Sequence, residues 1–126
     1  MLRDGQVSAY VPVSNVERGR EFYEGVLQQR PREEGDAGVL YECAHRSTFF
    51  MYLSDGAGTS RASCAFWTVD DIEREVADLT DRGVTFERYD LPGMNKDGDI
   101  ATGGGAKAAW FKDPDGNILA LIQELS

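Results

Sequence analysis

Two short stretches, "VSNVER" starting at Val13 and "VDDIER" starting at Val69, share one pattern of residue types. Each follows an apolar run, residues 7–13 in the first case and residues 63–69 in the second. An apolar run that ends at a polar residue, followed by apolar residues at helical spacing, predicts a strand leading into a helix. The chain is therefore predicted to contain the same strand–helix unit twice.

The start of each predicted helix has its own signal. Ser14 and Asp70 are residue types that favour the N-cap, and Glu17 and Glu73 stand three residues later, as in a capping box. In the second helix the apolar positions Ile72, Val76 and Leu79 recur at helical spacing. Gly83 is a residue type that ends helices.

Strand-like runs separated by turn residues follow each helix. In the first half they cover residues 29–33, 39–43 and 48–53, and in the second half residues 84–89, 107–112 and 117–123. Residues 91–99 are predicted to form a long loop, and the "GGG" at 103–105 flexible backbone before a strand. Each half therefore has the predicted order β-α-β-β-β.

These runs define the predicted domain organisation. The chain of 126 residues is expected to be a single domain, 1–126, with modules 6–53 and 62–124 joined by a glycine- and serine-rich linker. The composition, 41% hydrophobic and 28% charged, is that of a globular protein. A chain of this length is long enough for a hydrophobic core and too short for two domains.

Charge and cysteine content exclude several classes of protein. A net charge of -9 argues against nucleic acid and anionic membranes as partners, because both need a basic surface. The N-terminus lacks the apolar segment of a signal peptide. Two cysteines, Cys43 and Cys64, are too few for a disulfide scaffold and fit no paired metal spacing. A cytoplasmic location is expected.

Three longer stretches carry a resemblance to a known family: "ERGREFYEGVL" (17–27), "VDDIEREVADLTDRGV" (69–84) and "AWFKDPDGNILAL" (109–121). In this order they resemble the vicinal oxygen chelate superfamily of glyoxalases, bleomycin resistance proteins and extradiol dioxygenases. The resemblance implies an α+β fold. Its two βαβββ modules would form a curved mixed sheet that cups a pocket, with the helices outside.

Enzymes of that family hold a divalent metal on the inward face of the first, fourth, fifth and eighth strands. The resemblance places these ligand positions at Ser8, at a residue near Met51, at Cys64 and at Ala120. A metal site needs three or four converging donors, and alanine supplies none. We therefore expect no metal cofactor. The dioxygenase chemistry is excluded because it needs two histidines, and His45 is the only one.

The same positions predict an apolar pocket, because side chains alternate between the two faces of a strand. On the fourth strand either Phe49 and Met51 or Thr48 and Phe50 face the pocket, and we choose the first pair. No catalytic residue is predicted, since Cys64 lacks a histidine to activate it. The predicted ligand-binding residues are Ser8, Tyr10, Phe49, Met51, Cys64, Phe66, Met94, Trp110, Ile118 and Ala120.

The sequence favours a metal-independent protein that binds and sequesters a flat hydrophobic or cationic small molecule, similar to the drug-sequestering branch of the family. An enzyme of the lyase or isomerase kind, like lactoylglutathione lyase but with an atypical or absent metal site, is the alternative. A structural dimer without ligand is a third hypothesis. A homodimer is expected, since single-chain members with two modules commonly pair.

Overall fold

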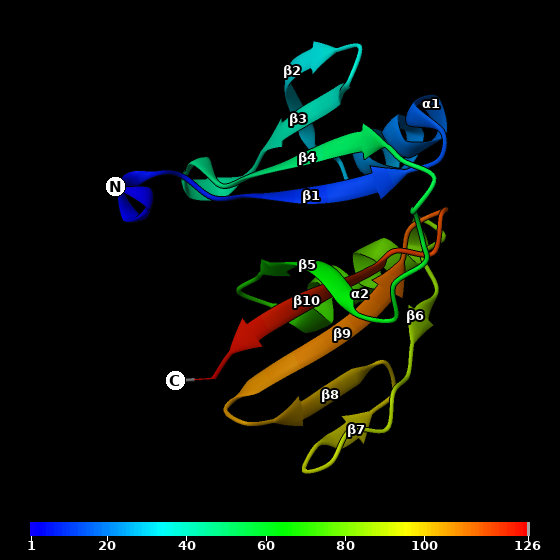
Figure 1. Cartoon of the computed structure of the whole chain (residues 1–126). Coiled ribbons are helices and arrows are strands. Elements are labelled where there is room, and N and C mark those ends of the chain that lie inside the picture. Colours follow the sequence, from blue (N-terminus) through cyan, green and yellow to red (C-terminus); the bar gives the residue numbers. More distant parts are fainter. Residues whose placement is uncertain (126) are drawn as a thin grey trace. The chain divides into compact units, whose positions relative to one another are not determined.

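A computed structural model describes residues 1–125, and these residues form two compact units (Figure 1). Unit 1 consists of Met1–Thr59 together with Pro114–Asn117. Unit 2 consists of Ser60–Asp113 and the residues from Ile118 onward. A short turn from the C-terminal half therefore belongs to the N-terminal unit.

Unit 1 contains a four-stranded mixed sheet in the order β1-β4-β3-β2. Strands β1 and β4 are parallel, and the other neighbours are antiparallel. Helix α1 continues directly into a π-helical turn, η2. The bounds are β1 Ser8–Val13, α1 Val16–Arg20, η2 Glu21–Val26, β2 Arg30–Gly35, β3 Gly38–Glu42 and β4 Thr48–Leu53, with short 3-10 helices at Leu2–Asp4 and Ala44–Arg46.

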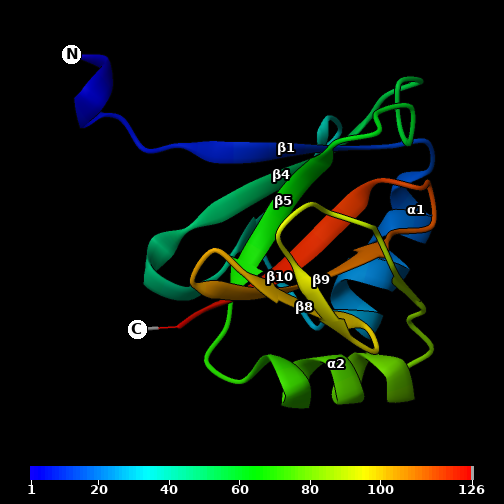
Figure 2. The ribbon, with the colours of Figure 1, turned by 90° about the horizontal axis from the view of Figure 1, so that it is seen from below.

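Unit 2 contains a six-stranded mixed sheet in the order β5-β10-β9-β8-β7, and β6 also pairs with β9. Strands β5 and β10 are parallel. Helix α2 lies along one face of this sheet and contacts β9 and β10 (Figure 2). The bounds are β5 Ser63–Thr68, α2 Ile72–Asp81, β6 Phe86–Glu87, β7 Asn95–Asp97, β8 Ile100–Gly103, β9 Ala106–Lys112 and β10 Ile118–Glu124.

The two units repeat one topology, which confirms the α+β class and the βαβββ order. The order β1-β4-β3-β2 in unit 1 corresponds to β5-β10-β9-β6 in unit 2. In each unit the first strand is parallel to the last and is joined to the second by a helix. Each unit builds its own mixed sheet. The hairpin β7–β8 has no counterpart in unit 1.

Both helices begin one residue later than predicted. The N-caps are Asn15 and Asp71, whose side chains accept hydrogen bonds from the backbone N–H three residues on, at 2.9 and 3.2 Å. The predicted capping boxes at Ser14 and Asp70 are wrong. The Ser14 hydroxyl is not free to cap α1 because it donates a hydrogen bond to Asp115.

The predicted loop and flexible glycines form two tight hairpins instead. Residues 95–97 form β7, which turns at Gly98 (φ 65°) into β8. Gly104 (φ 61°) and Gly105 (φ 79°) then form a two-residue turn between β8 and β9. Both lie in the left-handed region, where glycine has no steric penalty. Since β8 occupies part of the β9 edge, only two residues of β6 pair there.

The core of unit 1 lies between one face of its sheet and the helical segment. Gly19 allows this close packing, since a Cβ atom there would lie 2.7 Å from the Met51 sulfur. The rings of Tyr41 and Phe49 stack with their centroids 4.9 Å apart. The buried residues of this core are Val11, Val13, Tyr23, Val39, Tyr41, Phe49 and Met51.

The core of unit 2 lies between α2 and the sheet. The helix buries Ile72, Val76 and Leu79, as their spacing predicts. These residues share the core with Val84, Phe86, Phe111, Leu119 and Leu121. The rings of Phe86 and Phe111 meet edge to face on the paired strands β6 and β9.

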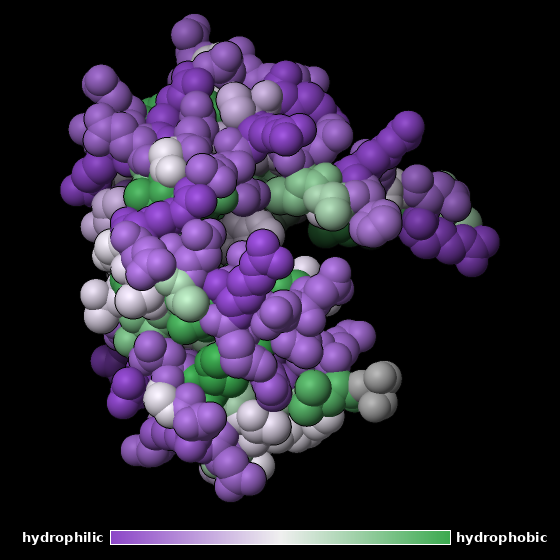
Figure 3. All heavy atoms as spheres, turned by 180° about the vertical axis from the view of Figure 1, so that it is seen from behind, coloured by the Kyte–Doolittle hydropathy of each residue, from purple (hydrophilic) through white to green (hydrophobic). Residues whose placement is uncertain are grey.

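The surface of the chain is dominated by hydrophilic side chains. Figure 3 shows the hydrophobic residues on one face as separate patches. No helix within residues 1–125 is long and apolar enough to cross a membrane.

Candidate functional site

The turn Pro114–Asn117 is fixed to unit 1 by its two polar side chains. The Asp115 carboxylate, 6% exposed, accepts hydrogen bonds from the backbone N–H and hydroxyl of Ser14 and from the Arg18 guanidinium at 2.8 Å. The Asn117 side chain donates to the carbonyl of Pro12 at 2.6 Å and accepts from the backbone N–H of Gly58. These hydrogen bonds engage both polar side chains of the turn. The turn therefore holds the fold together and is not a ligand-binding loop.

An aromatic surface lies on the face of the unit 1 sheet that is turned away from the helix. Tyr10, 67% exposed, pairs in register with Phe50 on β4 and also contacts Tyr52. The ring centroids of Tyr10 lie 6.0 Å from Phe50 and 5.0 Å from Tyr52, both edge to face. At one end the hydroxyls of Ser8 and Thr48 share a hydrogen bond. We call this surface the unit 1 face.

The choice of Phe49 and Met51 for this face was wrong. They pair in register with Ala9 and Val11, which point to the other side of the sheet from Tyr10. Both side chains are buried in the core of unit 1. Their alternatives, Thr48 and Phe50, lie on the unit 1 face.

A second aromatic surface crosses the unit 2 sheet. Phe66 on β5, Ala120 on β10 and Trp110 on β9 pair in register and so lie in one row on one face. Phe66 is 63% exposed and Trp110 half-buried, whereas the alanine between them is buried. The ring of Tyr89 lies edge-on to Trp110, with the centroids 5.6 Å apart. We call Phe66, Ala120 and Trp110 the unit 2 row.

Two other predicted residues, Ile118 and Cys64, lie close to this row in the sheet. Ile118 is buried two positions before Ala120 on β10. Cys64 is half-buried. It lies where the register between β5 and β10 shifts, because Ile118 pairs with Ser63 whereas Leu119 pairs with Ala65. Met94, in contrast, lies beside Gly103 at the end of β8, whose partner Ala106 is four residues before Trp110 on β9.

The environment of Cys64 disfavours its reactive form. Burial raises the pKa of the thiol, and the nearby Asp113 carboxylate raises it further. A thiol with a raised pKa is mostly protonated at neutral pH and is a poor nucleophile. This side chain is therefore suited to packing rather than to covalent catalysis.

The residues at the family's metal positions do not fit a metal. The Ser8 hydroxyl is engaged with Thr48, Met51 is buried on the opposite face of its sheet, and Ala120 has no donor atom. Cys64 favours the protonated thiol, whereas metals bind the thiolate. Within residues 1–125, no three His, Cys, Asp or Glu side chains gather into a group that could hold a metal ion.

The sequence prediction named Phe50 only in the pair that was not chosen, and it missed Tyr52 and Tyr89. Phe50 and Tyr52 follow from strand alternation once the register of β4 with β1 is known. Tyr89 falls two residues after Glu87, the partner of Trp110 in β6. Side chains alternate between the two faces along residues 84–89, so Tyr89 is expected on the same face as Glu87, and this pattern would have identified it.

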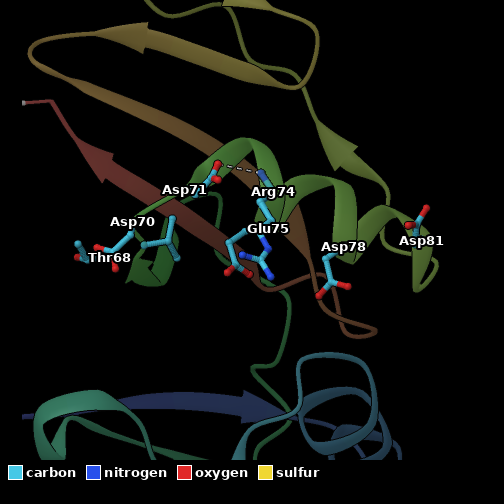
Figure 4. A pocket seen from close by; sticks show the side chains of 8 residues that line it. Thr68, Asp70, Asp71, Arg74, Glu75, Asp78 and Asp81 are labelled. Carbon is cyan, nitrogen blue, oxygen red and sulfur yellow. Dashed lines mark hydrogen bonds between the residues drawn. The ribbon is translucent and has the colours of Figure 1, made fainter.

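An acidic hollow of about 720 Å³, which was not predicted from the sequence, lies beside α2. Figure 4 shows that its side chains come from the end of β5 and from one side of the helix. Asp71 is held by its bond to the Arg74 backbone N–H. The lining residues are Thr68, Val69, Asp70, Asp71, Arg74, Glu75, Asp78 and Asp81. Five carboxylates and one guanidinium make this surface attractive to cations.

The repeated βαβββ topology, with a parallel first and last strand in each unit, defines the class as a two-module α+β protein of the glyoxalase fold. The chain belongs to the Glyoxalase/Bleomycin resistance protein/Dioxygenase superfamily, whose family model matches residues 5–121. No curated protein sequence matches the chain.

Solved structures share this fold at low sequence identity. TnmS3, an antibiotic binding protein from Streptomyces sp. CB03234, is 22% identical with a TM-score of 0.68, and 95% of each chain is covered. A glyoxalase family protein from Enterococcus faecalis is 21% identical with a TM-score of 0.71, covering 97% of this chain and 99% of that one. A superfamily member from Sphaerobacter thermophilus DSM 20745 is 24% identical with a TM-score of 0.69, covering 95% and 97%.

Proposed function

We propose that this protein binds a small molecule without a metal, and that a flat aromatic group of the ligand lies over Ala120 between Phe66 and Trp110. The observation that carries the proposal is the unit 2 row itself. Neighbouring strands lie about 4.8 Å apart, so the two aromatic residues are about 10 Å apart at the backbone. The small alanine between them leaves an apolar floor bordered by two rings.

The energetics of such a site are favourable for an aromatic ligand. Burying about 150 Å² of a ring contributes about 4 kcal/mol at about 25 cal/mol per Å². Association costs remove a large part of this gain. Micromolar binding therefore needs further contacts from unit 2 besides those of the two rings.

The comparisons support a binding role. TnmS3, which shares the fold over 95% of this chain, is described as an antibiotic binding protein. Sequestration of a compound of that kind needs an apolar surface and no catalytic group. The raised pKa of Cys64 and the alanine at position 120 agree with such a role.

The charge of the chain adds a preference among ligands. A net charge of -9, together with the acidic hollow beside α2, favours neutral or cationic compounds over anionic ones. A flat aromatic compound that carries an amine would satisfy both the preference for an aromatic ring and the preference for a cationic ligand. Its affinity should fall with added salt, whereas that of a neutral compound should not.

A variant pair tests the proposed site. Phe66→Ala removes one ring of the unit 2 row and should weaken the binding of planar compounds about tenfold, because about 1.4 kcal/mol of contact is lost. Leu53→Ala is the control, since Leu53 is 61% exposed, close to the 63% of Phe66, and lies elsewhere. Calorimetric titration measures both. Equal binding by both variants would place the ligand elsewhere.

We also propose a cytoplasmic homodimer. Strands β1 and β2 are the outer strands of the unit 1 sheet, and such strands leave unpaired backbone groups that favour pairing. Leu2 and Val7, 94% and 89% exposed, add apolar surface beside β1. Sedimentation at micromolar concentration should give twice the 13.9 kDa chain mass. A monomer at that concentration would refute the dimer.

A further inference from the structure

One buried polar atom in unit 2 has no hydrogen-bond partner among the described residues. It is the hydroxyl oxygen of Tyr89, which follows β6. A buried hydroxyl without a partner costs on the order of the hydrogen bond it lost, and such groups are rare in folded proteins. The Tyr89 hydroxyl is therefore a candidate for binding a group that the described residues do not supply.

Tyr89 is one of the residues that line a small cavity. The cavity has a volume of about 10 Å³, which is room for one water-sized atom. Its walls come from Tyr89, from the hairpin β7–β8 and from Trp110. Trp110 is the residue that borders the unit 2 row, so the cavity adjoins the proposed ligand surface.

The charged groups around the cavity are already paired. The Arg88 guanidinium binds the Asp99 carboxylate at 3.1 Å, and the Lys96 ammonium binds Asp90. Glu87, the remaining charged residue of the lining, has the Lys112 ammonium 3.7 Å away. Because each charged group already has a partner of opposite sign, we favour a neutral ligand group at the cavity over a further carboxylate or ammonium group. A neutral oxygen acceptor suits both the single-atom space and the free O–H donor of Tyr89.

We propose that the Tyr89 hydroxyl donates a hydrogen bond to a carbonyl oxygen on the flat ring that lies against Trp110. This inference rests on the proposed function and names its ligand class more closely, as a neutral planar carbonyl compound. The ring lies over the unit 2 row, and the carbonyl oxygen enters the cavity. Tyr89 is thereby a specificity residue that distinguishes a carbonyl compound from its hydrocarbon analogue.

Two probes that differ only in the carbonyl test this inference. 9-Fluorenone and fluorene share one planar ring system, and only the first has an oxygen. The wild-type protein should bind 9-fluorenone about threefold to tenfold more tightly, as expected for one net hydrogen bond. Tyr89→Phe should abolish this preference and leave the affinity for fluorene unchanged. Calorimetric titration measures all four affinities.

The outcomes separate the two proposals. Equal binding of both probes to the wild type, or a preference that survives Tyr89→Phe, overturns the role of Tyr89 while the binding surface stands. Binding of neither probe overturns the proposed function as well.

A ligand-free measurement adds an independent test. Because the hydroxyl has no partner in the free protein, Tyr89→Phe should melt at the same temperature as the wild type or higher. A clear loss of stability would mean that a fixed internal water or another group already holds the hydroxyl, and would overturn the inference.

Discussion

At the scale of single residues, the proposed function depends most on Ala120. A side chain with an oxygen or nitrogen donor at this position could bind a metal ion. The methyl group of alanine instead presents an apolar surface between Phe66 and Trp110. Its neighbours in the row are large and exposed or half-buried, and Ala120 itself is buried. The proposed function places the flat ligand over this small side chain, between the two rings.

Enlarging this residue should close the site. Ala120→Leu adds a branched side chain between the two rings, and binding of 9-fluorenone should fall at least tenfold. Because Ala120 is buried, the larger side chain should also lower the melting temperature, so binding is measured well below that temperature, where the variant is folded. Titration and thermal unfolding measure the two effects. Full binding by Ala120→Leu would contradict the proposed position of the ligand.

Glu24 gives a prediction for pH. Its carboxylate accepts hydrogen bonds from the Arg20 guanidinium and from the Tyr41 hydroxyl at 2.8 Å. The Arg20 bond first, and then the Tyr41 bond, lower the pKa of Glu24 below its ordinary value of 4.5, although burial opposes them. A lowered pKa in the folded state stabilises the fold above the unfolded-state pKa, and this stability is lost as the pH falls.

Glu24→Gln should therefore be less stable than the wild type at pH 7, and the difference should shrink below about pH 4, where the unfolded-state carboxyl also takes up its proton. Urea unfolding at several pH values measures it. A difference that does not depend on pH would show that the charge of Glu24 contributes nothing.

At the scale of elements, the hairpins of unit 2 depend on left-handed glycines. Gly104 has φ 61° and no heavy atom within 4 Å of the position of a Cβ atom. Gly104→Ala should therefore cost about 1 kcal/mol from backbone conformation alone. Gly25→Ala is the matched control, because Gly25 has the same open space in a helical segment without positive φ. Gly25→Ala should leave the free energy of unfolding unchanged or raise it. An equal loss of stability in both variants would contradict the role of the left-handed backbone at Gly104.

The elements differ in how well the sequence predicts them. The strand–helix repeat is readable because "VSNVER" and "VDDIER" put polar caps and apolar positions in the same order. Strand β4, "TFFMYL", is apolar on both faces, so alternation alone could not assign Phe49 or Phe50 to the ligand side. The hairpin β7–β8 was missed because Asn95–Asp97 is exposed throughout and has no apolar alternation.

At the scale of the whole molecule, the chain consists of two units, and one turn of its C-terminal half, Pro114–Asn117, belongs to unit 1. Asp115, which lies in the C-terminal half of the sequence, is buried against the start of α1 in unit 1. The sequence could mark "DPDG" as a turn but not its partners, because the contact joins residues about a hundred positions apart. Strand alternation put Phe66, Ala120 and Trp110 on one face but could not choose between Phe49 and Phe50. The sequence also could not show that the Tyr89 hydroxyl lacks a hydrogen-bond partner, because this depends on the tertiary packing around it.

Asp115→Asn keeps the shape of the side chain but removes the charge that pairs with Arg18. The free energy of unfolding should fall by about 1.5–3 kcal/mol, as for buried hydrogen bonds to charged groups. Asp36→Asn, at an exposed turn, is the control and should change it by less than about 0.5 kcal/mol. Equal losses would show that the turn is not fixed by Asp115.

The two tryptophans of the chain give the most direct test of the binding site. Trp110 borders the unit 2 row, whereas Trp67 pairs with Leu121 and points to the other face of the same sheet. In an NMR titration with 9-fluorenone, the indole N–H signal of Trp110 should shift progressively while that of Trp67 stays in place. A compound that binds and shifts Trp67 alone, or neither signal, would contradict a ligand site over Ala120.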